Sequence, residues 1–487
     1  MNRLLERIHE VCLVLLFLLV FLSFNVLTAT SYPLPNVDEC VASEPAISVF
    51  HGQGFSDRTY EMVNTYAFLL VPWVKLFGAS LRSIRSADIA SMTVALFLLW
   101  SAVKRFNIVT AASWRLLLLP LIATEFGVIF SYRSGRYDGF GMLLMSVALW
   151  LMSVRKRRAR LISLFLLCSL VPWAGPQYLP VLLAAGLTLL LLFRRRYLEE
   201  VVSSFVASAI GGAIFLAILF ATGRLKGFLN ATVPQIRGPR FVSALVSRGE
   251  FHHHNYIPKD FSFLFLFGAA IVLYVFFRRR KHLIQCPALS YGILFVILLG
   301  GLLLLLGKFP TYYSYMIAVP LAVSVCSGLS TCGANRPRSA ALLLCTLSSL
   351  AGAGLNSTAY AFDYEDHDYS YIEKFIADSV RANDVAWVDP QVYLATRQRV
   401  RDAYFPVPDW DITTLMSQEQ KDSITVLIIP AEWFDNISGS LGGTWQETGK
   451  ELVPVEHSMF GNRNLGFVTW KQRDHRVFRR RNALGSH

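Results

Sequence analysis

The chain has 487 residues, of which 54% are hydrophobic and only 16% are charged, and its formal net charge is +13. Apolar runs long enough to cross a bilayer recur along most of the chain, which excludes an ordinary soluble protein. The Lys and Arg residues cluster between these runs, where they orient membrane spans, so the positive charge does not indicate a nucleic-acid partner.

The first predicted span covers residues 9–30. Arg3 and Arg7 precede it, as in a secretory signal, but its length and the lack of a small-residue cleavage site favour a retained anchor. If the N-terminus is cytoplasmic, this span ends at the external face. The acidic pair Asp38 and Glu39 follows a few residues later and is then expected outside the membrane.

A second charged site, with Arg133, Arg136 and Asp138, precedes a span predicted near residues 139–154. The basic run after that span places its start outside, on the same side as Asp38. Three apolar stretches lie between the two sites, and an odd number of crossings would separate them. We therefore expect that one stretch does not span or that two share a crossing. The residues competing for the cytoplasmic loop are Lys104, Arg105 and Arg115 in one segment and Arg82 and Arg85 in another; the three stretches are 65–78, 88–103 and 108–131.

Further along, basic runs border apolar segments and are expected in the cytoplasm. The complete chain is predicted to hold about 11–13 transmembrane helices in an all-α polytopic bundle. The two external loops of most interest are residues 223–260 and 308–313. The basic runs are 155–160, 194–196, 278–281 and 336–338, and the later spans are expected near 161–174, 177–193, 201–222, 261–277, 288–307, 315–332 and 339–356.

The composition changes after Tyr360, which divides the chain into a membrane domain of residues 1–360 and a soluble extracytoplasmic domain of residues 361–487. An amphipathic pattern over residues 372–380 predicts a helix. Short β-rich runs follow at 385–388, 424–429 and 467–470, so a small α/β domain is expected. It contains no phosphate loop, nucleophile elbow or metal motif, and we expect it to cap the external site or to contact an acceptor.

The cysteine and histidine patterns give no metal or redox motif. The seven cysteines are scattered without the close spacing of a zinc or disulfide-exchange site. Residues 252–254 are three consecutive histidines, which point in different directions on a helix or strand and so cannot all bind one ion in regular structure. No metal ligand is predicted; a divalent metal is an open alternative that the sequence does not favour.

Several motifs occur together in a fixed order: Val37-Asp38-Glu39, Tyr66 to Gly78, Ser131 to Asp138, and Lys308 to Tyr313 before Pro320-Leu321-Ala322. The chain resembles the polyprenyl-phosphate-sugar-dependent glycosyltransferases of the C-type membrane fold, the group that contains protein O-mannosyltransferases and lipid A aminoarabinose transferases. The resemblance covers roughly residues 1–330. Residues 64–67 read Asn-Thr-Tyr-Ala where members often carry Pro-Pro-Leu-Tyr, which leaves the subtype open.

The chemistry of such a transfer needs a base for the acceptor proton and positive charge for the departing phosphate. Asp38 is the predicted base, with Glu39 in support, and single displacement would invert the anomeric carbon. Arg133, Arg136 and Lys308 are the predicted phosphate ligands. Asp138 would orient an arginine or contact the sugar. The resemblance also implies that His253 or His254, and Tyr312, line the cavity.

The predicted function is thus transfer of a sugar from a polyprenyl-phosphate donor to a hydroxyl on an envelope lipid, glycan or protein. No cofactor is firmly implied, and membrane lipids are expected partners. A polyprenyl-lipid or solute transporter, and an envelope-glycan polymerase or ligase, are the alternatives. A bacterial inner membrane with the site outside is favoured. Sequons at Asn230, Asn356 and Asn436 leave the endoplasmic reticulum open.

Overall fold

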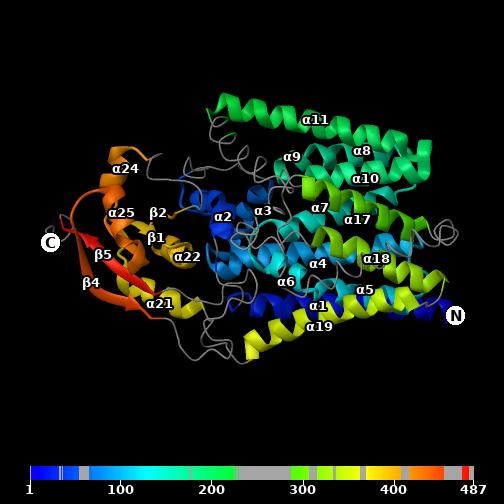
Figure 1. Ribbon diagram of the computed structural model, residues 1–487, viewed down its shortest axis with the longest axis horizontal. Helices are drawn as coiled ribbons and strands as arrows, with labels where there is room; N and C mark the ends of the chain where they lie inside the picture. The colour runs from blue at the N-terminus through cyan, green and yellow to red at the C-terminus, as the bar shows by residue number, and fades with distance from the viewer. Residues whose placement is uncertain are drawn as a thin grey trace, which may run out of the picture.

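A helical bundle and a small α/β domain make up the computed structural model (Figure 1), in which the two chain termini lie at opposite ends of the long axis. Four predicted site residues fall outside the residues that the structure describes: Lys308, Tyr312, His253 and His254. The predicted span 261–277 and the predicted strand 467–470 also fall outside them. The described residues are 2–31, 35, 37–53, 65–175, 178–223, 225, 229, 287–305, 315–332, 336–361, 369–406, 416–453 and 474–481.

The bundle confirms the predicted all-helical membrane part. Its described helices are α1 (Asn2–Leu27), α2 (Val37–Phe50), α3 (Thr65–Phe77), α4 (Leu81–Arg105), α5 (Ala112–Ala123), α6 (Phe126–Arg133), α7 (Asp138–Met152), α8 (Arg157–Ser169), α9 (Val171–Ala174), α10 (Tyr178–Phe193), α11 (Leu198–Ala221), α17 (Pro287–Leu305), α18 (Tyr315–Cys332) and α19 (Arg336–Ala361). Within the described residues, three helices are long and apolar enough to cross a membrane by themselves: α1, α4 and α11. The chain is an integral membrane protein.

The stretch predicted as one span over residues 108–131 is two helices. α5 and α6 are bent by 66° relative to each other, and together they are long and apolar enough for a broken span or a re-entrant loop. The break is at Thr124-Glu125, where the Glu125 side chain accepts a hydrogen bond from the Val128 amide (2.8 Å) and caps α6. A side-chain cap at the start of the second helix satisfies backbone amide groups that the bend leaves without partners inside a helix.

In the described residues, the stretch over residues 65–78 forms a helix that is too short to cross a membrane by itself. Its helix α3 has 13 residues, a length of about 20 Å, which is short of a hydrocarbon core of about 30 Å. The helix lies beside the start of α4, since Trp73 Nε1 donates to Ser86 Oγ (2.9 Å) and the Tyr66 hydroxyl donates to the Ile84 carbonyl oxygen (3.5 Å).

α4 and α7 begin at the same end of the bundle. The Phe140 amide donates to Asp88 Oδ1 (3.0 Å), which joins the second turn of α4 to the first turn of α7. The bent pair α5–α6 leads the chain from the end of α4 back to the start of α7. The odd number of apolar stretches therefore does not prevent the two charged sites from lying together. Arg85, one of the residues considered for the cytoplasmic loop, is fully buried beside Glu39.

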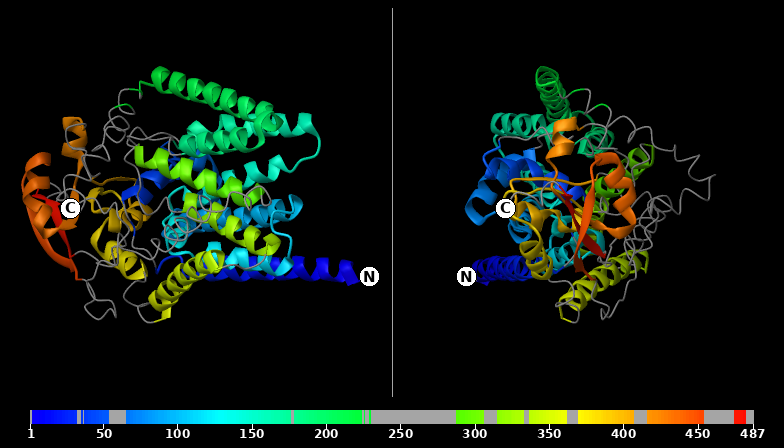
Figure 2. Two further views of the ribbon diagram at one scale, coloured as in Figure 1. Left: turned by 45° about the vertical axis from the view of Figure 1, so that its right-hand side comes forward. Right: turned by 90° about the vertical axis from the view of Figure 1, so that its left-hand side faces the viewer.

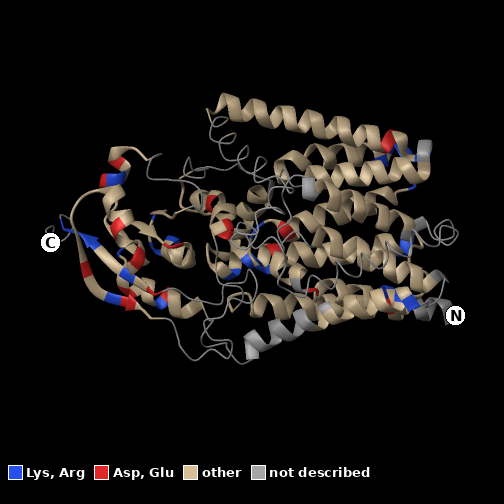
Figure 3. Cartoon of the chain, viewed as in Figure 1, with Lys and Arg blue, Asp and Glu red and all other residues tan. Residues whose placement is uncertain are grey.

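The other end of the bundle carries a separate charge cluster. Glu10 of α1 accepts from Arg115 of α5 (2.8 Å) and from Lys104 at the end of α4 (3.0 Å). Figure 3 shows charged residues gathered toward the two ends of the bundle, with long stretches free of charge between them. This distribution is the one expected of helices whose middle turns lie in lipid.

The C-terminal region is an α/β domain with a mixed sheet, as predicted. Its strand order is β2-β1-β3-β5-β4, with β2, β1 and β3 parallel and β5 and β4 antiparallel to their neighbours. Figure 2 shows the domain placed over one end of the bundle. The elements are α21 (Tyr369–Ser379), β1 (Val385–Val388), α22 (Pro390–Arg399), β2 (Asp402–Tyr404), α24 (Gln418–Ser423), β3 (Val426–Pro430), α25 (Phe434–Leu441), β4 (Trp445–Leu452) and β5 (His475–Arg480).

The two parts share a hydrophobic core. One cluster of buried residues includes Ile47 of α2, Leu70 of α3 and Ile84 of α4 together with Val392 of α22 and Ile428 of β3. Burial of apolar surface contributes about 25 cal/mol per Å² to stability, so a core continuous between two parts favours a fixed relative position. The soluble domain is therefore packed on the end of the bundle where α2, α3 and α4 meet.

Candidate active site

Arg136 lies between the two aspartates that the sequence singled out. Its Nη1 is 2.9 Å from Asp38 Oδ2 and its Nε is 3.4 Å from Asp138 Oδ2. The Arg136 and Asp138 side chains are 4% and 0% exposed, whereas the Asp38 side chain is 50% exposed. The structure thus brings together residues about a hundred positions apart, and Asp38 is the carboxylate of the pair that a substrate can reach.

A tight turn between α6 and α7 presents Arg136. Gly135 has a φ of +62°, a conformation that glycine adopts without the steric cost of a Cβ. A Cβ at this position would lie 2.3 Å from Glu39 Oε1. The turn is therefore seated directly against α2, the helix that carries both predicted acidic residues.

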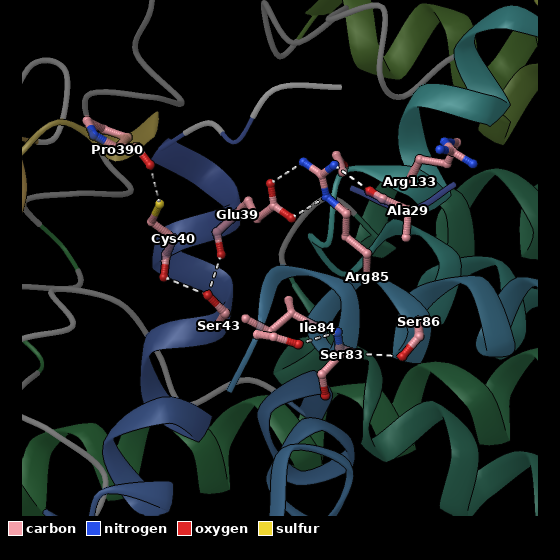
Figure 4. Close-up of polar contacts among 12 residues, drawn as sticks. Ala29, Glu39, Cys40, Ser43, Ser83, Ile84, Arg85, Ser86, Arg133 and Pro390 are labelled. Carbon is pink, nitrogen blue, oxygen red and sulfur yellow. Dashed lines mark hydrogen bonds and ion pairs between the residues drawn. The ribbon is translucent and has the colours of Figure 1, made fainter. Parts of the chain in front are cut away.

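Glu39 forms a buried ion pair with Arg85 (Figure 4). Its carboxylate accepts hydrogen bonds from Arg85 Nε (2.7 Å) and Arg85 Nη2 (2.8 Å), and both side chains are fully buried. Arg85 Nη1 also donates to the Ala29 carbonyl (2.8 Å). A bidentate pair of this kind fixes orientation as well as distance. These contacts give Glu39 a role in holding α2 against α4 and the end of α1.

Arg133 forms hydrogen bonds with the same end of α1. Its Nη1 donates to Asn25 Oδ1 (2.8 Å) and to Thr28 Oγ1 (2.9 Å), and its Nη2 to the Thr28 carbonyl. The side chain is fully buried. Of the two arginines predicted to bind phosphate, Arg136 therefore lies beside Asp38, and Arg133 anchors α6 to α1.

Two tyrosine hydroxyls lie beside Asp138. Tyr315 of α18 donates to Asp138 Oδ1 (3.4 Å) and is 2.9 Å from the hydroxyl of Tyr178 of α10. Gly141 makes room for this arrangement, because a Cβ there would collide with the Tyr178 hydroxyl. The sequence analysis missed both tyrosines, since neither belongs to a charged motif. Helices from three distant segments converge on one carboxylate.

Asp88 was also missed. It lies in the second turn of α4, is fully buried, and accepts the Phe140 amide, while no hydrogen bond reaches its Oδ2 from the described residues. Gly139 permits the close approach, because a Cβ there would lie 2.5 Å from the Asp88 carbonyl oxygen. A carboxylate inside an apolar helix is costly unless it is used, and this was the signal available in the sequence.

Asp38 and Arg136 supply what group transfer to a hydroxyl needs: an accessible base and a fixed cation beside it. Among the residues that the structure describes, no group of three or more His, Cys, Asp or Glu side chains is placed to hold a metal ion. The predicted contributions of Lys308, His253, His254 and Tyr312 fall outside those residues.

The fold is the C-type glycosyltransferase fold that the sequence motifs predicted. The structure is similar to the crystal structure of ArnT from Cupriavidus metallidurans bound to undecaprenyl phosphate, with a TM-score of 0.57 over 98% of this chain and 99% of that one. The sequences are 10% identical. No protein-family model matches the chain, and no curated protein does so either.

Proposed function

We propose that the chain is an inverting glycosyltransferase that moves a sugar from a polyprenyl-phosphate donor to a hydroxyl acceptor. The observation that carries the proposal is the half-exposed Asp38 carboxylate 2.9 Å from the buried Arg136 guanidinium. The fold shared with ArnT, a protein crystallised with undecaprenyl phosphate, supports a lipid-phosphate donor.

In this reaction the acceptor oxygen forms a bond to the anomeric carbon as the bond from that carbon to the phosphate oxygen breaks. Asp38 takes the acceptor proton, and the polyprenyl phosphate leaves with the bonding electrons. Arg136 binds the phosphate oxygens through its fixed donors. When the phosphate binds the Arg136 guanidinium, it competes with Asp38 for this partner. The Asp38 carboxylate is then able to accept a proton.

Asp138 has a supporting role in the proposal. It is buried on the far side of Arg136 and is held by Tyr315, so it orients the guanidinium. Lys308 would add a second cation at the leaving phosphate. No cofactor is part of the proposal. The end of the bundle that carries Asp38 would face the outside of a bacterial inner membrane, with the soluble domain on the same side, and the acceptor would be an envelope lipid, glycan or protein.

The test is transfer of radiolabelled sugar from a panel of polyprenyl-phosphate sugars in membranes that contain wild type, Asp38→Asn or Asp138→Asn protein at equal amounts. Glu199→Gln is the control, because this side chain is 56% exposed at the start of α11 and pairs with Arg157. We expect transfer by wild type and control and at least a 100-fold loss in Asp38→Asn, a loss typical of removing a general base. Full activity in Asp38→Asn would overturn the site. No transfer by wild type from any donor would favour transport or polymerisation.

A further inference from the structure

Helix α2 is clamped from two sides, and one clamp comes from the soluble domain. On the bundle side, Glu39 pairs with Arg85. On the other side, Glu44 Oε1 is 3.1 Å from Arg397 Nη2 and Glu44 Oε2 is 3.3 Å from Arg397 Nε. The Arg397 and Glu44 side chains are 0% and 3% exposed. Arg397 belongs to α22, so a buried ion pair joins the soluble domain to the helix that carries Asp38.

Other contacts between α2 and the soluble domain surround this ion pair. The Tyr393 hydroxyl donates to Glu44, and the Cys40 thiol donates to the Pro390 carbonyl at 3.4 Å (Figure 4). Just after α2, a ring nitrogen of His51 lies 2.8 Å from the Arg397 carbonyl oxygen. The contacts run from the first turn of α2 past its end, so α22 lies along the whole helix.

α2 depends on such contacts because its own sequence forms a weak helix. It has 14 residues and contains Pro45. Proline inside a helix removes a backbone hydrogen bond, and helices of this length are marginal in water even with good helix formers. Its position relative to Arg136 therefore follows from the groups that hold its two sides.

We infer that Arg397 is a positioning residue, through which the soluble domain holds α2 so that Asp38 stays opposite Arg136. The domain is then a part of the transfer machinery and more than a cap over it. The effect of Arg397 on catalysis rests on the proposed function, in which Asp38 is the base. The contact between Arg397 and α2 does not depend on that function.

The clamp is tested without any sugar transfer by labelling Cys40 with a maleimide in the full-length protein. Burial raises the pKa of the Cys40 thiol well above its usual value, so the docked helix should react slowly. Mass spectrometry of the Cys40 peptide gives the labelling rate, with the other cysteines as internal references. We expect Arg397→Met and Glu44→Gln to raise the rate about ten-fold or more, because each leaves one charge of a buried pair without its partner. Arg397→Lys should lie between them and wild type.

Arg479→Met is the matched control. Arg479 of β5 forms a buried pair with Asp384 at 3.0 Å, within the same domain but away from α2. This variant should weaken the domain to a comparable extent and leave the Cys40 labelling rate near that of wild type. Equal labelling in the Arg397→Met and Arg479→Met variants would mean that Arg397 contributes only general stability, and that outcome overturns the inference.

Transfer kinetics then test the catalytic consequence. Arg397→Met should lower kcat about ten-fold or more at near-constant KM for the donor, with partial recovery in Arg397→Lys, because Asp38 is displaced while the phosphate ligand Arg136 stays in place. Faster labelling with unchanged kcat would overturn the positioning role. If wild type transfers no sugar, the proposed function fails, and the labelling rates alone decide whether the domain holds α2.

Discussion

Gly135 lies so close to Glu39 that a Cβ added at this glycine would be 2.3 Å from Glu39 Oε1. Gly135→Ala should lower the free energy of unfolding by about 2–5 kcal/mol, from left-handed backbone strain plus the collision. It should also reduce transfer, since the turn presents Arg136. Gly52→Ala is the control, because Gly52 has a similar φ of +74° with nothing within 4 Å of the added Cβ. Thermal unfolding in detergent measures both; an equal effect at the two glycines would contradict close packing of the turn on α2.

The ion pair between Glu39 and Arg85 should be costly to break. Glu39→Gln leaves a fully buried guanidinium with a neutral partner, and removing one member of such a pair costs about 3–5 kcal/mol. Glu199→Gln removes a partner of Arg157 where both side chains are more than half exposed, and exposed pairs contribute about 0–1 kcal/mol. Unfolding temperatures of the two variants give the comparison, and similar temperatures would show that the Glu39 pair is not buried in the protein.

Tyr315→Phe should slow transfer modestly without unfolding the protein. The lost hydroxyl lies 3.4 Å from Asp138 Oδ1, and a hydrogen bond to a charged group contributes about 1.5–3 kcal/mol at good geometry. Because this bond is long, we expect a fall in kcat of about 3–10-fold, which is less than the loss expected for a short bond. Tyr291→Phe is the control, since Tyr291 stacks on Phe295 in α17. A larger loss at Tyr291 would argue against a role for Tyr315 at the site.

His51 should make the attachment of the soluble domain sensitive to acid. Burial, and then the positive charge of Arg397, lower the pKa of His51, although Glu44 and Asp402 act in the opposite direction. A group whose pKa is lower in the folded than in the unfolded state contributes its full stability at pH values above its unfolded pKa, which is near 6.5 for histidine. That stability is lost as the pH falls through the folded pKa. The unfolding temperature of wild type should therefore drop as the pH falls below about 6.5. His51→Gln should show a smaller drop over the same range, and an equal drop would assign the acid sensitivity to other groups.

The sequence predicted the parts of this fold that depend on composition and local pattern. Spans near 88–103, 201–222, 288–307, 315–332 and 339–356 correspond to α4, α11, α17, α18 and α19. The soluble α/β region was predicted from its change in composition. The bend between α5 and α6 was not, because both sides of it are equally apolar and hydropathy does not register a break in direction.

The site was predicted less completely, for a physical reason. Asp38, Arg136 and Asp138 were selected because charged residues next to apolar runs are conspicuous, and the structure brings the three together. Arg133 and Glu39 are equally conspicuous, yet the structure buries both in contacts with α1 and α4, and sequence spacing does not distinguish an arginine that faces a substrate from one that faces a helix end. Tyr178 and Tyr315 come from separate helices, so their approach to Asp138 depends on tertiary packing.

The pair Glu44 and Arg397 is separated by 353 positions in the chain, and this has a consequence for biosynthesis. At a synthesis rate of about 5–20 residues per second, Glu44 waits roughly 20–70 s for its partner. During that interval α1 and α4 can already be inserted while α2 has only its bundle-side contacts. A nascent or C-terminally truncated chain would thus reach the membrane without the contacts between α2 and the C-terminal domain, and these contacts would form only after that domain has folded.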